Sequence, residues 1–185
     1  MIQALFAAPP RLGDVRVLAI DGPSGAGKST SARAVLAALS TLDARTAMVS
    51  TDAFATWDDP VSWWPRLEQG VLAPLAAGRP GSYRAMEWAD GSPRPGRLVP
   101  VDVPEVLILE GVSSGRRAVR SRLSCLCWID GGSEAARLTR TVTRDGEHSR
   151  LDLHRWQLFE RGWFPVDGTR AAANIHLLHA LNAPR

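Results

Sequence analysis

Short runs of apolar residues alternate along the chain with longer segments in which apolar residues recur every three or four positions. The runs predict buried strands at residues 15–20, 45–51, 105–111, 123–130 and 174–178. The segments with helical spacing predict helices at residues 29–39, 133–145 and about 151–162, the second with Ser133 as its N-cap. Because strands that alternate with helices are typical of α/β domains, the pattern predicts a three-layer fold with a mainly parallel five-stranded sheet and helices on both faces.

Two segments fit this alternation less well. From Pro60 to Leu75 the apolar residues follow a helical spacing, although Pro65, Gly70 and Pro74 weaken the pattern. Residues 78–104 are rich in Gly, Pro and Arg and predict a long excursion or a short hairpin. Excursions of that length inside a compact domain are usually functional.

Composition limits the class of protein. The 185 residues are 45% apolar and 22% charged, as expected of one soluble globular domain that spans residues 1–185. The net charge is only +3, and no arginine-rich run is interleaved with aromatic residues, so we expect no nucleic-acid partner. No segment approaches the ~20 apolar residues of a membrane span, and the start lacks the features of a signal peptide. Cys125 and Cys127 share one face of a predicted strand and are poorly placed to bridge each other, so we expect buried thiols and a cytoplasmic protein.

Residues 22–29, Gly-Pro-Ser-Gly-Ala-Gly-Lys-Ser, match the phosphate-binding pattern G-x-x-x-x-G-K-[ST] between a predicted strand and a predicted helix. Glycines let such a loop turn its N–H groups toward phosphate oxygens, and the helix N-terminus adds its dipole. Lys28 is the only lysine among 22 basic residues, and a compact ammonium fits this loop where a planar guanidinium does not. The predicted nucleotide-binding residues are Gly22, Ser24, Gly25, Ala26, Gly27, Lys28, Ser29 and Thr30.

Two carboxylates are predicted beside this loop, since Asp52 follows one strand and Glu110 ends another. We predict a Mg²⁺ site formed by Ser29, Asp52 and Glu110, with ATP and Mg²⁺ as cofactors. Asp52 either accepts the proton of an attacking hydroxyl group or is mainly a Mg²⁺ partner. The alternatives without a role in catalysis or metal binding are a turn-capping role for Asp52 and a structural hydrogen bond for Glu110.

An arginine-containing lid is predicted over residues 144–150, with Arg144 as the residue that neutralises the transferring phosphoryl group. Arg137 and Arg140 are either lid residues or part of a solvated helix face. The predicted catalytic residues are Asp52, Lys28 and Arg144. A GTPase is excluded, because its N-K-x-D motif would need a second lysine.

These motifs together resemble the uridine kinase family of P-loop kinases, over about residues 15–178. The resemblance is carried by "GPSGAGKST", "STDAF", "WDDPVSWW", "MEW", "VLILEG" and "RLTRTVTRD". Residues 62–80 and 83–88 also look like the corresponding segments of a branch of uridine-kinase-like proteins from high-GC bacteria. The resemblance implies that Asp52 is the base or Mg²⁺ partner, that Glu110 belongs to the metal shell, that Arg144 is a lid arginine, and that Glu87 lies near the acceptor's hydroxyl groups.

The sequence departs from that family where the family reads a uracil base. Ala55 replaces an aromatic residue, Trp64 replaces an acid, and no histidine follows Trp88. Uridine itself is therefore a doubtful acceptor. We interpret residues 78–104 as an insertion on the acceptor side, and the predicted acceptor-binding residues are Phe54, Trp57, Arg66, Tyr83, Arg84, Glu87 and Trp88.

The leading hypothesis is an ATP- and Mg²⁺-dependent kinase that moves the γ-phosphoryl group to a hydroxyl group of a nucleoside or similar small metabolite. The alternatives are a nucleoside monophosphate kinase, which would gain support if Arg66 and Arg84 converge on an acceptor phosphate, and a nucleotide-binding protein without transferase activity. The sequence leaves open the identity of the acceptor, the choice between ATP and GTP, and the oligomeric state.

Overall fold

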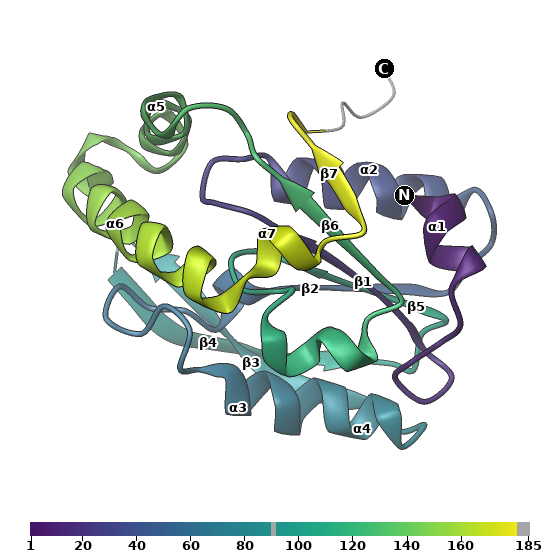
Figure 1. Cartoon of the computed structure of the whole chain (residues 1–185). Helices are drawn as coiled ribbons and strands as arrows, with labels where there is room; N and C mark the ends of the chain where they lie inside the picture. The colour runs from purple at the N-terminus through teal and green to yellow at the C-terminus, as the bar shows by residue number, and fades with distance from the viewer. Residues whose placement is uncertain (90–91, 181–185) are drawn as a thin grey trace.

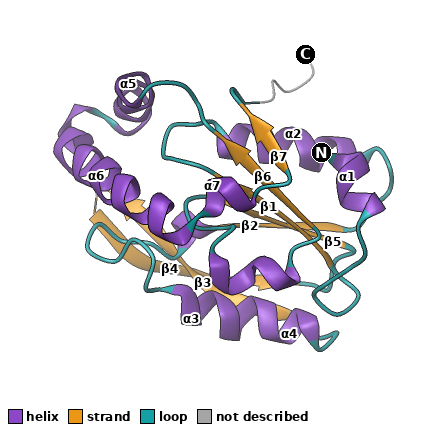
Figure 2. Ribbon diagram, in the orientation of Figure 1, coloured by secondary structure: helices purple, strands orange, loops and turns teal. Residues whose placement is uncertain are grey.

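A computed structural model describes residues 1–89 and 92–180. Its main sheet has five strands in the order β2-β5-β1-β6-β7, and every neighbouring pair is parallel. The strands are β1 (Arg16–Asp21), β2 (Thr46–Ser50), β5 (Val106–Glu110), β6 (Cys125–Ile129) and β7 (Ile175–Leu177). The predicted sheet is confirmed, and Figures 1 and 2 show helices on both of its sides.

The two faces of the sheet bury separate apolar clusters, because alternate strand residues point in opposite directions. Leu18 and Ile108 face α1 (Ile2–Ala7) and α2 (Lys28–Ser40). Ala19 and Leu109 face the opposite cluster, which contains the helical segment after β2. The predicted three layers are thus confirmed. Both cysteines are free and buried in the first of these clusters.

The helical segment predicted from Pro60 begins only at Trp64 and consists of α3 (Trp64–Leu67), a π-helical turn η2 (Glu68–Leu72) and α4 (Ala73–Ala76). Pro65 lies in the first turn, where a missing N–H group costs nothing. Pro74 follows the wider π turn, which makes room for a ring that would otherwise meet the carbonyl group four residues earlier.

The excursion at residues 78–104 is a long antiparallel hairpin rather than a short one. It is formed by β3 (Gly81–Ala89) and β4 (Ser92–Val101), which make a second, two-stranded sheet. The prolines of β4 are compatible with this role, because an edge strand can spare N–H donors.

The last third of the chain places two helices beyond the carboxyl ends of the strands (Figure 1). They are α5 (Glu134–Asp145), whose predicted N-cap Ser133 accepts a hydrogen bond from the Ala136 N–H group, and α6 (Arg150–Asp167). Helix α6 continues five residues past its predicted end and stops at Gly168, which adopts a left-handed conformation with φ 71°. The remaining helical elements are η1 (Thr51–Ala53), η3 (Arg117–Arg122), η4 (Glu147–Ser149) and α7 (Thr169–Ala172).

Within the described ranges, no helix is long and apolar enough to span a bilayer.

Candidate active site

The loop between β1 and α2 forms a cradle at the N-terminus of α2. Gly27 adopts a left-handed conformation with φ 93° and leads directly into the helix at Lys28. No side chain of the described residues caps this helix, so its first N–H groups face an adjacent cavity of about 250 Å³. Such a helix end favours an anion. The cavity is lined by Ser24, Gly25, Gly27, Lys28, Ser29, Thr30, Arg33, Asp52, Arg140, Thr141 and Arg144.

Six of the eight predicted nucleotide-binding residues line this cavity, and the other two, Gly22 and Ala26, are buried residues of the same loop. Lys28 is only 7% exposed, and its Nζ donates a hydrogen bond of 2.9 Å to the carbonyl oxygen of Pro23. The ammonium group is therefore held inside the curl of the loop.

A hydroxyl group and two carboxylates lie beside the cradle. The Ser29 hydroxyl donates a 3.0 Å hydrogen bond to Oε2 of Glu110, and Asp52 follows β2, which pairs with β5 in a register that aligns Ser50 with Glu110. Burial raises the pKa of Glu110, and the Asp52 charge raises it further, while Ser50, Lys28 and Ser29 lower it. Hard oxygen atoms of this kind fit Mg²⁺, so Ser29, Asp52 and Glu110 could hold the ion.

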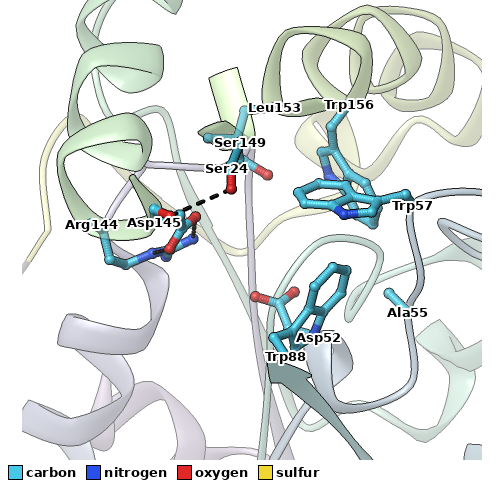
Figure 3. Close-up of a pocket in the computed structure, with 10 residues that line it drawn as sticks. All are labelled: Ser24, Asp52, Ala55, Trp57, Trp88, Arg144, Asp145, Ser149, Leu153 and Trp156. Carbon is cyan, nitrogen blue, oxygen red and sulfur yellow. Dashed lines mark hydrogen bonds and ion pairs between the residues drawn. The ribbon is translucent and has the colours of Figure 1, made fainter. Parts of the chain in front are cut away.

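A second cavity of about 320 Å³ adjoins the first, and Ser24, Asp52 and Arg144 line both. Its remaining lining residues are Ala55, Trp57, Trp88, Asp145, Ser149, Leu153 and Trp156. In Figure 3, the three indole rings lie on one side of this cavity and the Arg144–Asp145 pair lies on the other. We call the first cavity the phosphate cavity and the second the acceptor cavity.

Among the three tryptophans of the acceptor cavity, Trp57 contacts each of the other two edge to face. The ring centroids of Trp57 and Trp88 are 4.8 Å apart at 73°, and those of Trp57 and Trp156 are 5.9 Å apart at 81°. They come from the loop after η1, from β3 and from α6. The flat faces of such rings favour a planar or apolar ligand.

The segment predicted as a lid contains one arginine, Arg144, that lines both cavities. Arg144 forms a forked ion pair with Asp145, with donor–acceptor distances of 2.6 and 2.7 Å, and the Asp145 hydrogen bond raises the Arg144 pKa. Arg137 and Arg140 instead donate to backbone carbonyl groups, those of Gly132 and Gly25 among them. Arg140 nevertheless lines the phosphate cavity.

The structure leaves five predicted acceptor-binding residues off the lining of the acceptor cavity. Phe54 is fully buried and stacks between Trp63 and Tyr83, because its side chain turns into the core between the helix and the hairpin. Arg66 donates to the Phe54 carbonyl oxygen at 2.6 Å, and Arg84 donates to the Gly96 carbonyl oxygen at 2.8 Å. Glu87 accepts a bond from the Arg97 N–H group within the hairpin. Of the predicted set, Trp57 and Trp88 line the cavity.

Several site residues were not predicted from the sequence. Ser149, Leu153 and Trp156 follow a helical spacing along the start of α6, a signal that was available but did not indicate which face meets the site. Asp145 directly follows the predicted lid arginine. Two buried acids also lie against the phosphate loop: Asp21, which ends β1, and Glu160 on α6.

Asp21 joins the loop to the segment after β5. Its carboxylate accepts N–H hydrogen bonds from Gly22, Ser113 and Gly115 at 2.7, 3.1 and 2.8 Å. Burial raises the Asp21 pKa to about 7, although these bonds and the nearby Lys28 charge lower it. The Asp21 carboxylate thus holds the loop in place, and the free-energy cost of burying it depends on pH because burial disfavours its ionised form.

Comparison with known proteins supports the fold. No protein-family model matches the chain, and no curated protein matches its sequence. Among solved structures, a possible uridine kinase from Bacillus stearothermophilus matches with a TM-score of 0.64 at 15% identity, over 88% of each chain. A protein described as a possible fructose transport system kinase from Silicibacter sp. TM1040 matches with a TM-score of 0.59 at 20% identity, over 98% of this chain and 96% of that one. The YGR205w protein matches with a TM-score of 0.50 at 11% identity, over 87% and 83%.

The chain therefore has the P-loop α/β fold found in uridine kinase-like proteins.

Proposed function

We propose that the protein is an ATP- and Mg²⁺-dependent phosphotransferase whose acceptor is a hydroxyl group of a small, ring-bearing metabolite such as a nucleoside. The observation that carries this proposal is the position of Asp52, which lines both the phosphate cavity and the acceptor cavity. A carboxylate at that junction can reach a nucleotide on one side and an alcohol on the other. The chain shares its fold with a protein described as a possible uridine kinase and with one described as a possible fructose transport system kinase. This likeness supports phosphoryl transfer as the chemistry.

The residues divide the work of an in-line transfer. The acceptor oxygen bonds to the γ-phosphorus while the bond from that phosphorus to the bridging oxygen of ADP breaks, and Asp52 takes the hydroxyl proton. Lys28 and Arg144 neutralise the charge of the transferring group. Mg²⁺, held by Ser29 and Glu110 with Asp52 nearby, would neutralise further phosphate charge.

The acceptor cavity favours an uncharged acceptor over a nucleoside monophosphate. Its lining includes two carboxylates, Asp52 and Asp145, against one arginine, Arg144, which is already paired with Asp145. Arg66 and Arg84, which would have supported a phosphorylated acceptor, bond to backbone carbonyl groups elsewhere. An acceptor phosphate would thus meet more negative than positive charge.

The test is an ADP-release assay with MgATP or MgGTP and a panel of nucleosides, free sugars and nucleoside monophosphates. We expect an uncharged member of the panel to stimulate ADP release, and Asp52→Asn to lower that release by about 10²-fold or more with little change in MgADP affinity. Asp43→Asn is the matched control, because Asp43 is an exposed residue after α2 whose φ of 53° suits asparagine.

Stimulation by monophosphates alone, with D52N retaining its turnover, would favour the monophosphate kinase. Nucleotide binding without stimulation by any compound would favour a binding protein that transfers nothing.

A further inference from the structure

Glu160 is a buried acid that contacts the phosphate loop from a distant part of the chain. It lies on α6, 136 residues after Ser24, and is 3% exposed. Its Oε1 accepts two hydrogen bonds from Ser24, one from the N–H group at 2.8 Å and one from the hydroxyl group at 2.5 Å. Both donors of Ser24 are therefore committed to this one carboxylate oxygen.

The position of Ser24 gives this contact a functional setting. Ser24 lines the phosphate cavity and the acceptor cavity, as do Asp52 and Arg144. A γ-phosphoryl group placed for transfer to an alcohol must lie at this junction. It would find free N–H and O–H donors at Ser24 if Glu160 did not occupy them.

The carboxylate of Glu160 is poorly compensated within the protein. Its second oxygen, Oε2, is buried and has no hydrogen-bond partner among the residues that the structure describes. Burial raises the pKa of Glu160, while the Lys28 charge from α2, the two Ser24 hydrogen bonds and the Arg137 charge from α5 lower it. A buried carboxylate with one unpaired oxygen stabilises a fold weakly, because its desolvation is only partly repaid. Fold stability alone therefore does not account for a carboxylate at this position.

We propose that Glu160 is a positioning residue that keeps the γ-phosphoryl group away from the donors of Ser24 and directs its charge toward Lys28 and Arg144. The negative charge of Glu160 lies directly behind Ser24, so a phosphoryl oxygen that moved toward Ser24 would meet repulsion. The group is then held where Asp52 faces the acceptor. This inference rests on the proposed function, because it requires a triphosphate in the phosphate cavity.

A positioning role for Glu160 predicts a different effect on nucleotide binding from a purely structural role. Removing the charge should tighten the binding of a nucleotide that carries a γ-phosphoryl group, while leaving that group badly placed for transfer. A brace would, on removal, weaken binding or leave it unchanged, and it would act alike on diphosphates and triphosphates.

The experiment compares wild type with Glu160→Gln by calorimetric titration of MgADP and of the magnesium complex of the non-hydrolysable β,γ-imido analogue of ATP. We expect E160Q to bind the imido analogue about threefold to tenfold more tightly and to change its MgADP affinity by less than about twofold. We also expect MgATP hydrolysis, with water as the acceptor, to fall about tenfold.

The matched control is Glu134→Gln, which removes the same charge from a residue that pairs with Arg161 and lines neither cavity. It should leave both affinities and the hydrolysis rate near those of wild type. Thermal unfolding checks that each variant folds. Should E160Q not fold, Glu160→Met, which is uncharged and similar in length, carries the same expectations.

The role of Glu160 would be overturned if E160Q bound the imido analogue no more tightly than wild type does, or if its affinities for the two nucleotides changed by the same factor. Unimpaired hydrolysis in E160Q would overturn it as well. Failure of the proposed function looks different, because the wild-type protein itself would then neither transfer nor hydrolyse, whatever the affinities of the variants.

Discussion

Lys28 lies among three buried acids, Asp21, Glu110 and Glu160, and its charge lowers the pKa of each. The ammonium group therefore has two tasks in this chain. It is available to a phosphate chain, and without that ligand it compensates the carboxylates around the loop. Under the proposed function, Lys28 is thus both a phosphate-binding group and part of the electrostatic balance of the loop.

Replacing Lys28 should consequently abolish turnover. We expect Lys28→Ala to lower MgATP turnover by at least about 10²-fold, because a donor directed at the transferring charge is lost. Lys28→Arg should not restore the activity, since the planar guanidinium is too wide for the curl of the loop that ends at the Pro23 carbonyl group. Steady-state ADP release measures both effects, and a K28R protein with near-normal turnover would contradict the assignment.

At the same scale, the sequence predicted those site residues that lie together in the chain. Six of the residues from 22 to 30 line one cavity, and the sequence could indicate this grouping because a loop of this kind is built from consecutive backbone groups. Trp156 and Glu160 could not, because their roles depend on which face of α6 meets the loop, and packing decides that. Phe54 and Tyr83 show the converse, since these aromatic residues lie near Trp57 and Trp88 in the sequence but stack on each other against the core.

At the scale of elements, the segment α3-η2-α4 approaches the hairpin backbone to backbone. A Cβ atom added at Gly70 would lie 2.5 Å from the carbonyl oxygen of Ser82 in β3. Glycine is therefore required here by the close approach of two backbones. The prediction of a weakened helix at Gly70 missed this contact, because a single sequence shows the missing side chain but not the strand that takes its place.

We expect Gly70→Ala to lower the free energy of unfolding by about 1–3 kcal/mol, because two backbones must separate to admit the methyl group. Gly162→Ala is the matched control, since a Cβ at this helical position in α6 would meet no atom within 4 Å. That variant should be more stable by about 0.5–1 kcal/mol, through the lost flexibility of glycine. Urea unfolding measures both variants, and a stabilised G70A would show that the hairpin yields easily.

At the scale of the whole molecule, the buried acids around the loop make stability depend on pH. The pKa of Asp21 is raised to about 7, and those of Glu110 and Glu160 are also raised. The folded protein therefore binds more protons than the unfolded chain between about pH 4 and pH 7. The contribution of these groups is fully present below that window and is lost as the pH rises through it.

We accordingly expect the nucleotide-free protein to have a higher free energy of unfolding at pH 5.5 than at pH 8. Hydrogen bonds lower the pKa values of Asp58 and Glu147, and these two groups therefore change stability with pH in the opposite direction. Their effect is small because both are fully exposed to solvent. Urea unfolding at several pH values tests the expectation, and a stability that rises steadily from pH 5.5 to pH 8 would contradict it.

The three indoles of the acceptor cavity belong to a loop, a hairpin and a helix (Figure 3). The phosphate cavity is instead lined mainly by the loop after β1, the start of α2 and the end of α5. Under the proposed function, phosphoryl transfer and the choice of alcohol would therefore depend largely on different segments of the chain. Mutation of the hairpin, or its exchange for another, would then change which alcohol enters and leave the loop after β1 intact. The same separation makes β3–β4 a practical graft point for laboratory redesign of selectivity.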